Sequence, residues 1–254
     1  MPDWDGEQYA QTSDLQRAMA TRAVAGLDLE PDDRLLDVGC GDGFVTRLLA
    51  ERLPEGRAVG VDASPRMIAK ADTASSNVQF VLADARDLPF RAEFDVVVSF
   101  NALHWVVEQQ RALGSIAAAA RPDARVLIQV VCAGDRPSLE TVAMEVAGSP
   151  RWVDRFAGFA PPFVHVDPDG YPDLAAAAGL RVTDLSVQDV TWDFGTHDAF
   201  AAWCSNGADA WTGRLAPQDR PHFLDDWVRA YEEVSGRAGL FLFTQMRADL
   251  RVHH

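Results

Sequence analysis

Residues 36–44, LDVGCGDGF, place three glycines at every second position between an apolar run and the first turn of a helical pattern. A strand that passes through a glycine turn into a helix directs backbone N–H groups at whatever lies in front of the helix. The missing side chains leave that stretch of backbone open to close approach. The segment therefore predicts an α/β fold with a ligand at the carboxyl end of its first strand.

The first half of the chain repeats this order of strand and helix. Strand-like runs cover 34–39, 57–64, 78–85, 94–103 and 125–131, and helical patterns cover 44–53, 65–72 and 113–121, the last closed by Pro122. The run through Val96–Val98 is apolar throughout, as in a strand that is covered on both faces. This alternation predicts a doubly wound α/β sheet.

After about residue 133 the pattern changes. Helical spacing covers 138–148, a turn and a helix follow in 167–180, and helical spacing returns from Thr196 to about Ser235. Two long strand candidates cover 181–194 and 239–252. We therefore expect seven strands, with the extra helices forming a cap over the carboxyl ends of the sheet, where ligands of such sheets bind.

Charge and composition exclude several classes of protein. The formal net charge of −15 disfavours nucleic acid and anionic membrane surfaces as partners. No apolar stretch reaches the roughly 18 residues of a membrane-spanning helix. Cys40, Cys132 and Cys204 are too few and too scattered for a disulfide framework or a zinc cluster. We expect a cytoplasmic monomer or homodimer that binds a small molecule and no metal.

Two aspartates complete the candidate ligand site. Asp62 ends the second strand, 19 residues after Gly43, where a carboxylate can take both hydroxyls of a ribose. Asp84 ends the third strand, where it can accept from an exocyclic amine. Phe44 stands where the dinucleotide pattern has a glycine, and no Gly-Lys-Ser/Thr follows, which disfavours a pyrophosphate cofactor. The residues indicate an adenosine-type ligand without phosphate.

Four segments in order resemble the motifs of class I S-adenosylmethionine-dependent methyltransferases: LLDVGCGDGFVTRLLAE, VGVDASPRMIAKA, FVLADARDLPF and FDVVVSFNALHWV. The resemblance covers roughly residues 30–131. It implies a Rossmann-like methyltransferase fold, a doubly wound sheet of seven strands whose last strand is antiparallel. It also implies S-adenosyl-L-methionine as the cofactor and methyl transfer as the activity.

The resemblance also assigns the cofactor site. The loop from Gly39 to Gly43 holds the methionine and ribose part, Asp62 takes the ribose hydroxyls, and Asp84 reads the adenine together with the backbone of Ala85. Asp37 either braces the glycine loop or contacts the ligand, and Cys40 is a small filler rather than a nucleophile. The cofactor-binding candidates are Asp37, Gly39, Cys40, Gly41, Gly43, Asp62, Ala63, Met67, Asp84, Ala85 and, facing the methionine portion, Asn101.

A narrower resemblance extends over most of the chain. The start DWDGEQY, the segment NALHWV and the cap sequences HDAFAAWC, RLAPQD and FLDDWVRAYEEV are similar to trans-aconitate methyltransferases and related small-molecule carboxyl methyltransferases, including the juvenile hormone acid group. These enzymes methylate a free carboxylate to an ester. In related plant enzymes an LHW segment places its tryptophan against the substrate carboxylate, which makes Trp105 the analogous residue.

The acceptor decides which catalytic groups are needed. A carboxylate with a pKa of about 4 is already ionised at neutral pH, so it needs orientation and desolvation rather than a base. A phenol, amine or carbon acceptor would more often need a base, for which His104 is the candidate. The catalytic candidates are His104 and Trp105, and the substrate-binding candidates are Trp4, Tyr9, His104, Trp105, Trp203 and Arg214, with Arg155 as a further anion clamp.

We expect four segments along the chain: 1–30 as a lid and helix, 31–134 as the cofactor-binding core, 135–180 as cap helices with the return to the sheet, and 181–254 as the last two strands, with cap helices at about 196–235. A lid would bring Trp4 and Tyr9 to the reacting methyl group, and the alternative is a frayed terminus.

Two other functions stay open at this point. One is a C- or hydroxyl-O-methyltransferase of a secondary-metabolite pathway, because caps of this kind are readily reshaped. The other is a non-catalytic S-adenosylmethionine-binding protein of the same fold. A nicotinamide oxidoreductase is disfavoured by Phe44.

Overall fold

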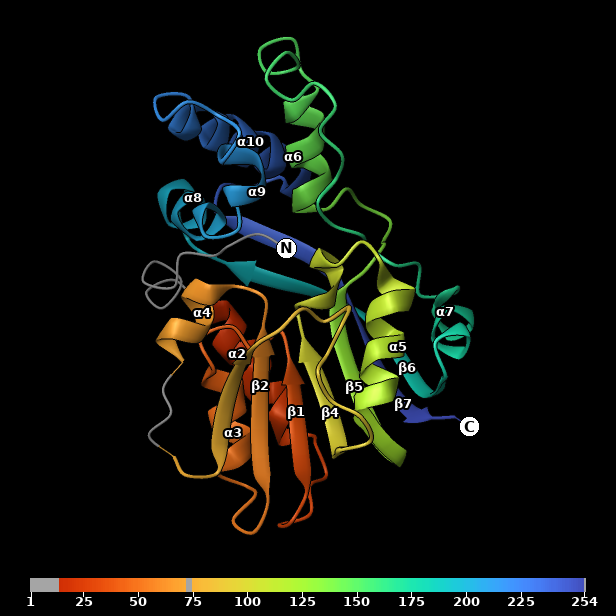
Figure 1. The fold of residues 1–254 in the computed structure, drawn as a ribbon. Helices are drawn as coiled ribbons and strands as arrows, with labels where there is room; N and C mark the ends of the chain where they lie inside the picture. The colour runs from red at the N-terminus through yellow and green to blue at the C-terminus, as the bar shows by residue number, and fades with distance from the viewer. Residues whose placement is uncertain (1–13, 72–74, 254) are drawn as a thin grey trace.

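The computed structural model describes residues 14–71 and 75–253. Within these ranges it forms one sheet in the order β3-β2-β1-β4-β5-β7-β6 (Figure 1). The strands β1 to β5 run parallel, whereas β7 lies antiparallel to both β5 and β6. The predicted seven-stranded sheet with an antiparallel last strand is therefore confirmed. The strands are β1 (Arg34–Val38), β2 (Arg57–Asp62), β3 (Val78–Leu82), β4 (Phe94–Phe100), β5 (Ala120–Val131), β6 (Leu180–Asp193) and β7 (Leu240–Val252).

Helices cover both faces of the sheet and one of its ends. No helix in the described ranges combines the length and the apolarity that crossing a bilayer requires. The helices are α2 (Asp14–Ala25), α3 (Phe44–Ala50), α4 (Pro65–Lys70), the short 3₁₀ turn η1 (Leu103–Trp105), α5 (Gln109–Ala119), α6 (Leu139–Ala147), α7 (Tyr171–Ala177), α8 (His197–Ser205), α9 (Asp209–Thr212) and α10 (Arg220–Ser235).

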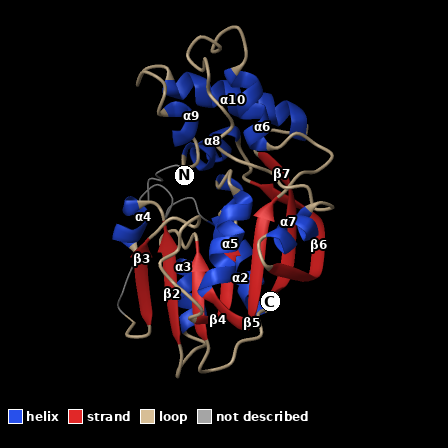
Figure 2. Ribbon diagram, turned by 45° about the vertical axis from the view of Figure 1, so that its right-hand side comes forward, coloured by secondary structure: helices blue, strands red, loops and turns tan. Residues whose placement is uncertain are grey.

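The strands alternate their side chains between two cores. Leu35 of β1 packs with Leu49 of α3 on one face, whereas Leu36 packs with Leu113 of α5 on the other. Both faces of these central strands are buried, which is why β4 reads as an unbroken apolar run. Figure 2 shows the resulting three layers of helix, sheet and helix.

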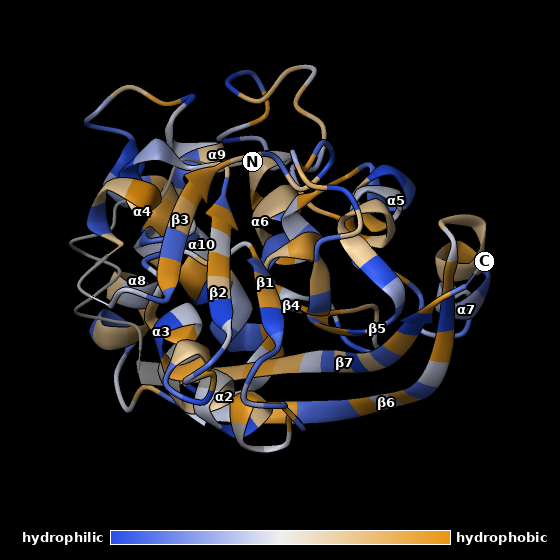
Figure 3. Cartoon of the chain, turned by 60° about the horizontal axis from the view of Figure 1, so that its bottom comes forward, coloured by the Kyte–Doolittle hydropathy of each residue, from blue (hydrophilic) through white to orange (hydrophobic). Residues whose placement is uncertain are grey.

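The outer strands differ from the central ones. Most residues of β6, at the edge of the sheet, are partly or fully exposed, and its hydropathy alternates along its length (Figure 3). Such alternation is expected for a strand that has only one buried face. β7 lies between β5 and β6 and carries the buried residues that close the core, including Met246 and Ala248.

A helical cap stands over the carboxyl ends of the parallel strands. It consists of α6, α8, α9 and α10, which follow β5 or are inserted between β6 and β7 (Figure 1). Its core is aromatic: Trp211, Phe200 and Phe223 are fully buried in it. Trp227 of α10 donates to the carbonyl of Leu139 over 2.7 Å, which joins α10 to α6.

Several boundaries differ from those predicted by the sequence, including those around β5 and at the end of β3. The helix before β5 covers residues 109–119 rather than 113–121. Pro122 does not close it, because the strand β5 has already begun at Ala120, which pairs with Phe94. The third strand ends at Leu82, so Asp84 lies in the following loop rather than in the strand.

Candidate active site at the carboxyl ends of the strands

The three glycines of the turn between β1 and α3 all have positive φ, but for different steric reasons. At Gly39 (φ 80°) an added Cβ would lie 2.1 Å from the Cβ of Ala102, and at Gly43 (φ 77°) it would lie 2.3 Å from the ring of Phe80. At Gly41 (φ 56°) an added Cβ would meet nothing within 4 Å. Gly39 and Gly43 thus allow the chain to pack against itself, whereas Gly41 is the member of the turn that faces open space.

Asp62 ties the turn to β2. Its Oδ2 accepts from the N–H of Gly41 over 3.0 Å, and its Oδ1 accepts from the N–H of Ser64 over 2.8 Å. The N–H of Gly39 donates to the carbonyl of Val61 over 2.8 Å. A carboxylate offers about four acceptor positions. Asp62 therefore holds the turn in shape, with both of its carboxylate oxygens engaged by backbone N–H groups.

Asp37 and Cys40 face the interior. Asp37 is 2% exposed, and its Oδ2 accepts from the hydroxyl of Thr46 over 2.6 Å. Burial raises the pKa of Asp37 to about 7. An added Cβ on Gly60 would lie 2.9 Å from the sulfur of Cys40, and burial raises the pKa of that thiol. Asp37 thus braces the start of α3, and Cys40 is a buried thiol that packs on β2.

A recess lies where the loops after β1, β2, β3 and β4 meet. Among the described residues that line it, Asp62 has the one ionisable side chain, and none carries a positive charge. Such a lining fits an uncharged nucleoside part better than a phosphate, which needs cationic or N–H donors. The recess is lined by Val38, Gly39, Val61, Asp62, Ala63, Ala83, Ala85, Ala102, Leu103 and Val106.

The loop after the third strand contributes Asp84 and Ala85 to this region. Ala85 is 5% exposed and lines the recess, whereas the side chain of Asp84 is 39% exposed. Hydrogen bonds from Arg86 lower the pKa of Asp84, so it carries its charge at neutral pH. The sequence analysis did not single out Arg86, although its position two residues after an aspartate permits such a contact.

The residue that follows the fourth strand, Asn101, has a left-handed backbone conformation. Asn101 has φ 53°, its N–H donates to the carbonyl of Gln129 over 2.7 Å, and its side-chain oxygen accepts from Gln245 over 3.1 Å. This conformation precedes Ala102, whose Cβ fills the space beside Gly39. Sequence reasoning missed Gln245 because 144 residues separate it from Asn101.

Met67 is buried in α4 behind the second strand. It is 3% exposed, and its N–H donates to the hydroxyl of Ser64 over 3.3 Å. Ser64 thereby caps a helix that begins with Pro65, as the sequence predicts.

His104 is buried in η1. It is 5% exposed, and burial, with a further contribution from His165, lowers its pKa to about 3. Its Nδ1 has no hydrogen-bond partner among the described residues. The ring of His165 lies 6.2 Å away, and His165 Nε2 lies 3.5 Å from a carboxylate oxygen of Glu140. His104 is therefore neutral at physiological pH and shielded from solvent.

Trp105 is half-buried and stands at the junction of core and cap. Its ring centroid lies 6.2 Å from that of Trp211, which is fully buried in the cap. Phe159 and Phe163, also half-buried, lie 6.2 Å and 6.3 Å from the same Trp211 ring. The rings of Trp105, Phe159 and Phe163 thus pack around Trp211, and these four rings are called the aromatic wall below.

The two arginine candidates differ in their partners. Arg155 donates to Asp219 over 3.2 Å and stacks over Trp152. Arg214 lies 5.0 Å over the ring of Phe159, and within residues 14–71 and 75–253 no carboxylate forms an ion pair with it. Of the two, Arg214 is the arginine that stands beside the aromatic wall without an ion pair to any described carboxylate.

Three substrate-binding candidates remain: Trp203, Trp4 and Tyr9. Trp203 packs in the cap core, with ring centroids 5.2 Å from Phe194 and 4.9 Å from Phe241. It has no ring contact with Trp105 among the described side chains. Trp4 and Tyr9 lie outside the described residues, so the predicted lid stays a prediction.

Comparison with known proteins decides the family. Residues 36–128 match a family described as methyltransferase domain. A trans-aconitate 2-methyltransferase of Azoarcus sp. (strain BH72) is 30% identical over 253 residues, which cover 97% of this chain and 98% of that enzyme. The chain belongs to the S-adenosylmethionine-dependent methyltransferases. Its cofactor is therefore S-adenosyl-L-methionine, as the strand-end motifs predict.

Other relatives support this methyltransferase assignment. A trans-aconitate 2-methyltransferase of Streptomyces avermitilis is 35% identical over 165 residues, which span 62% of this methyltransferase and 61% of the Streptomyces enzyme. The solved structure of the YcgJ protein of Bacillus subtilis has the same fold, with a TM-score of 0.68, 18% identity, and coverage of 94% of this chain and 99% of that one.

A further solved structure contains the cofactor. It is phosphoethanolamine N-methyltransferase 2 of Haemonchus contortus in complex with S-adenosyl-L-methionine, with a TM-score of 0.58, 16% identity, and coverage of 94% of this methyltransferase and 52% of that chain.

Proposed function

We propose that this methyltransferase transfers the methyl group of S-adenosylmethionine to a carboxylate of a small acid, forming a methyl ester. The observation that carries the proposal is the state of His104. It is the one histidine of the segment that follows β4, and it is buried, neutral and without access to solvent. Because His104 is buried and therefore poorly placed to serve as a base, the segment suits an acceptor that is already ionised, and a carboxylate is such an acceptor at neutral pH.

The relatives support the same acceptor class. The enzymes of Azoarcus and Streptomyces avermitilis are named trans-aconitate 2-methyltransferases. The Azoarcus enzyme aligns over nearly the whole of this chain. Trans-aconitate is a small carboxylic acid. An acid of that kind is the first candidate substrate, and Trp105 is the residue proposed to lie against the carboxylate that is methylated.

The cofactor site is proposed to follow the strand ends. When bound, S-adenosylmethionine supplies an electrophilic methyl group on a sulfonium. The backbone around Gly41 would lie along the methionine and ribose part, Asp62 would accept from the ribose hydroxyls, and Asp84 with Ala85 would bind the adenine. The apolar lining of the recess and the absence of a cation in it support this arrangement.

The cap is proposed to orient the acid. Half-buried rings beside Trp105 would exclude water from the acceptor, which strengthens electrostatic contacts there. Arg214 would bind a carboxylate, because its guanidinium is held on Phe159 and no described carboxylate compensates its charge. Holding the reactants in line accounts for much of the rate in such a reaction, about 7–11 kcal/mol of the barrier.

The test is a screen with methyl-labelled S-adenosylmethionine. Acids, phenols, amines and keto acids are offered one by one, and the labelled product is treated with mild base. The proposal predicts label in an acid and its release by base as methanol, because esters are hydrolysed under these conditions. Label that appears only in base-stable products would show a hydroxyl, nitrogen or carbon acceptor instead, and no label in any class would contradict the proposal.

A further inference from the structure

Arg86 holds the carboxylate of Asp84 through several bonds. Its Nε donates to Oδ1 over 3.0 Å and to Oδ2 over 3.1 Å, and its Nη2 donates to Oδ2 over 2.6 Å. The backbone N–H of Arg86 donates to Oδ1 over 2.9 Å. Three N–H groups of Arg86 thus occupy most of the about four acceptor positions of Asp84, and the planar guanidinium fork fixes the plane in which the remaining position points.

A second carboxylate fixes Arg86 in turn. Nη1 of Arg86 donates to Oε2 of Glu108, the residue that immediately precedes α5. The chain Asp84–Arg86–Glu108 thus joins the loop after β3 to the start of α5. The recess is lined by the loop after β3, through Ala83 and Ala85, and by the segment that leads into α5, through Leu103 and Val106. The ion pairs therefore bridge the two walls between which the adenine is proposed to lie.

The exposure of these groups argues against a purely structural role. The side chains of Asp84, Arg86 and Glu108 are 39%, 38% and 49% exposed. Ion pairs at such exposed positions contribute little to the stability of a fold, because water and salt screen them. Their geometric effect is larger, since a short exposed carboxylate without a partner samples several rotamers.

We propose that Arg86 is a positioning residue for the adenine. It holds Asp84 in the orientation in which the carboxylate accepts from the exocyclic amine, and Glu108 holds Arg86. Ordering the acceptor before the cofactor arrives reduces the conformational entropy lost on binding. This inference rests on the proposed placement of the adenine at Asp84, and it assigns Arg86 and Glu108 roles beyond that placement.

The opposite role for Arg86 makes the opposite prediction. If the guanidinium merely blocked Asp84, its removal would free the carboxylate and tighten cofactor binding. Calorimetry with S-adenosylhomocysteine separates the two roles. The positioning role predicts about tenfold weaker binding for Arg86→Ala, the effect of losing one well-oriented charge-assisted hydrogen bond. Unchanged or tighter binding overturns it.

A second ligand distinguishes positioning from general damage to the site. S-inosylhomocysteine carries a carbonyl where adenine has its amine, so a correctly aimed carboxylate repels it. The positioning role predicts that Arg86→Ala lowers the preference for the adenine ligand, whereas a merely structural role would weaken both ligands equally. Arg86→Lys keeps the positive charge but lacks the planar fork of the guanidinium. Its preference for the adenine ligand should therefore lie between those of the wild type and Arg86→Ala.

Two further variants complete the design. Arg91→Ala removes an arginine of the same loop that donates only to backbone carbonyls, and it should leave the preference unchanged. Asp84→Asn tests the adenine placement itself. If Asp84→Asn retains the wild-type preference, the placement is wrong and the role of Arg86 falls with it. If Asp84→Asn loses the preference while Arg86→Ala keeps it, only the role of Arg86 is overturned.

Discussion

Among single residues, Asp37 lowers the stability of the fold when its carboxylate is charged, so its effect depends on pH. It is 2% exposed, and the hydroxyl of Thr46 is its one side-chain donor. Burial raises its pKa from 3.8 to about 7, so the folded chain binds the proton more tightly than the unfolded chain does. The free energy of unfolding therefore falls as pH rises through the window from about 4 to 7.

Replacing Asp37 by asparagine isolates this effect. The amide keeps the shape and can still accept from Thr46, but it carries no charge. Asp37→Asn and the wild type should have similar free energies of unfolding at pH 4, and the variant should be more stable at pH 8 by up to about 4 kcal/mol. Urea unfolding at both pH values checks this. A variant that loses stability relative to the wild type as pH rises would contradict it.

Gly39 and Gly41 form a matched pair for the turn. Both have positive φ, which costs a residue with a side chain about 1–2 kcal/mol. An alanine at Gly39 would also place its Cβ 2.1 Å from Ala102, whereas one at Gly41 would meet no atom within 4 Å. Gly39→Ala should therefore destabilise the protein more than Gly41→Ala in thermal unfolding. Equal destabilisation would show that strain alone sets the cost.

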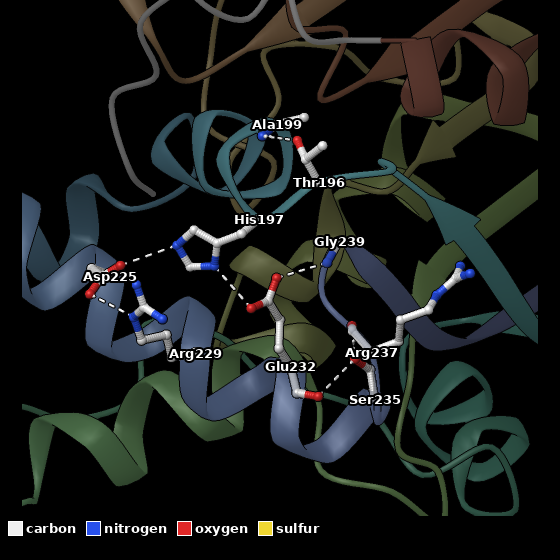
Figure 4. Close-up of polar contacts among 9 residues, drawn as sticks. All are labelled: Thr196, His197, Ala199, Asp225, Arg229, Glu232, Ser235, Arg237 and Gly239. Atoms are coloured by element: carbon white, nitrogen blue, oxygen red, sulfur yellow. Dashed lines mark hydrogen bonds and ion pairs between the residues drawn. The ribbon is translucent and has the colours of Figure 1, made fainter.

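At the scale of elements, an imidazole joins α8 to α10 within the cap. Nδ1 of His197 lies 2.9 Å from a carboxylate oxygen of Glu232, and its Nε2 lies 3.1 Å from one of Asp225 (Figure 4). The other oxygen of Glu232 accepts from the N–H of Gly239 over 2.7 Å, which ties the start of β7 to the same group. The hydrogen bond that His197 donates to Glu232 raises the pKa of His197, an effect that burial and, to a smaller extent, the nearby Arg229 oppose.

The raised pKa of His197 predicts a pH-dependent contribution to stability. The ion pairs are complete below about pH 6.5, the pKa in an unfolded chain, and are lost as pH rises through the higher pKa of the folded state. His197→Gln should therefore cost more stability at pH 6 than at pH 9, measured by urea unfolding. His222→Gln removes an exposed histidine of α10 and is the control. A loss of stability for His197→Gln that does not change with pH would contradict this role of the His197 ion pairs.

The strands and helices of the core can largely be predicted from the sequence, because glycine spacing and apolar runs are local signals. LDVGCGDGF predicts its strand, turn and helix correctly. The partners of the site are not local. The burial of His104 depends on a chain segment some 60 residues away, and nothing in the sequence distinguishes Arg155, paired with Asp219, from Arg214. Such pairings appear only when the cap folds over the sheet.

At the scale of the whole molecule, the two halves of the chain contribute different sides of the site. The first half supplies the strand ends and Trp105, and the second half, whose cap helices stand over those strand ends (Figure 1), supplies Trp211 and Arg214. Arg214→Ala should raise the KM for the acid about tenfold with little change in cofactor affinity, since one charge-assisted contact is lost. Arg155→Ala should leave the KM unchanged. Equal effects of the two variants would remove Arg214 from the proposed site.

A crystal structure with S-adenosylhomocysteine would test whether the strand ends hold the adenosyl cofactor beneath the cap. We expect the ribose hydroxyls on Asp62, the backbone of Gly41 against the ligand, and the sulfur on the side of Trp105. A ligand bound at another place on the chain, or a ribose that leaves Asp62 untouched, would contradict this expectation.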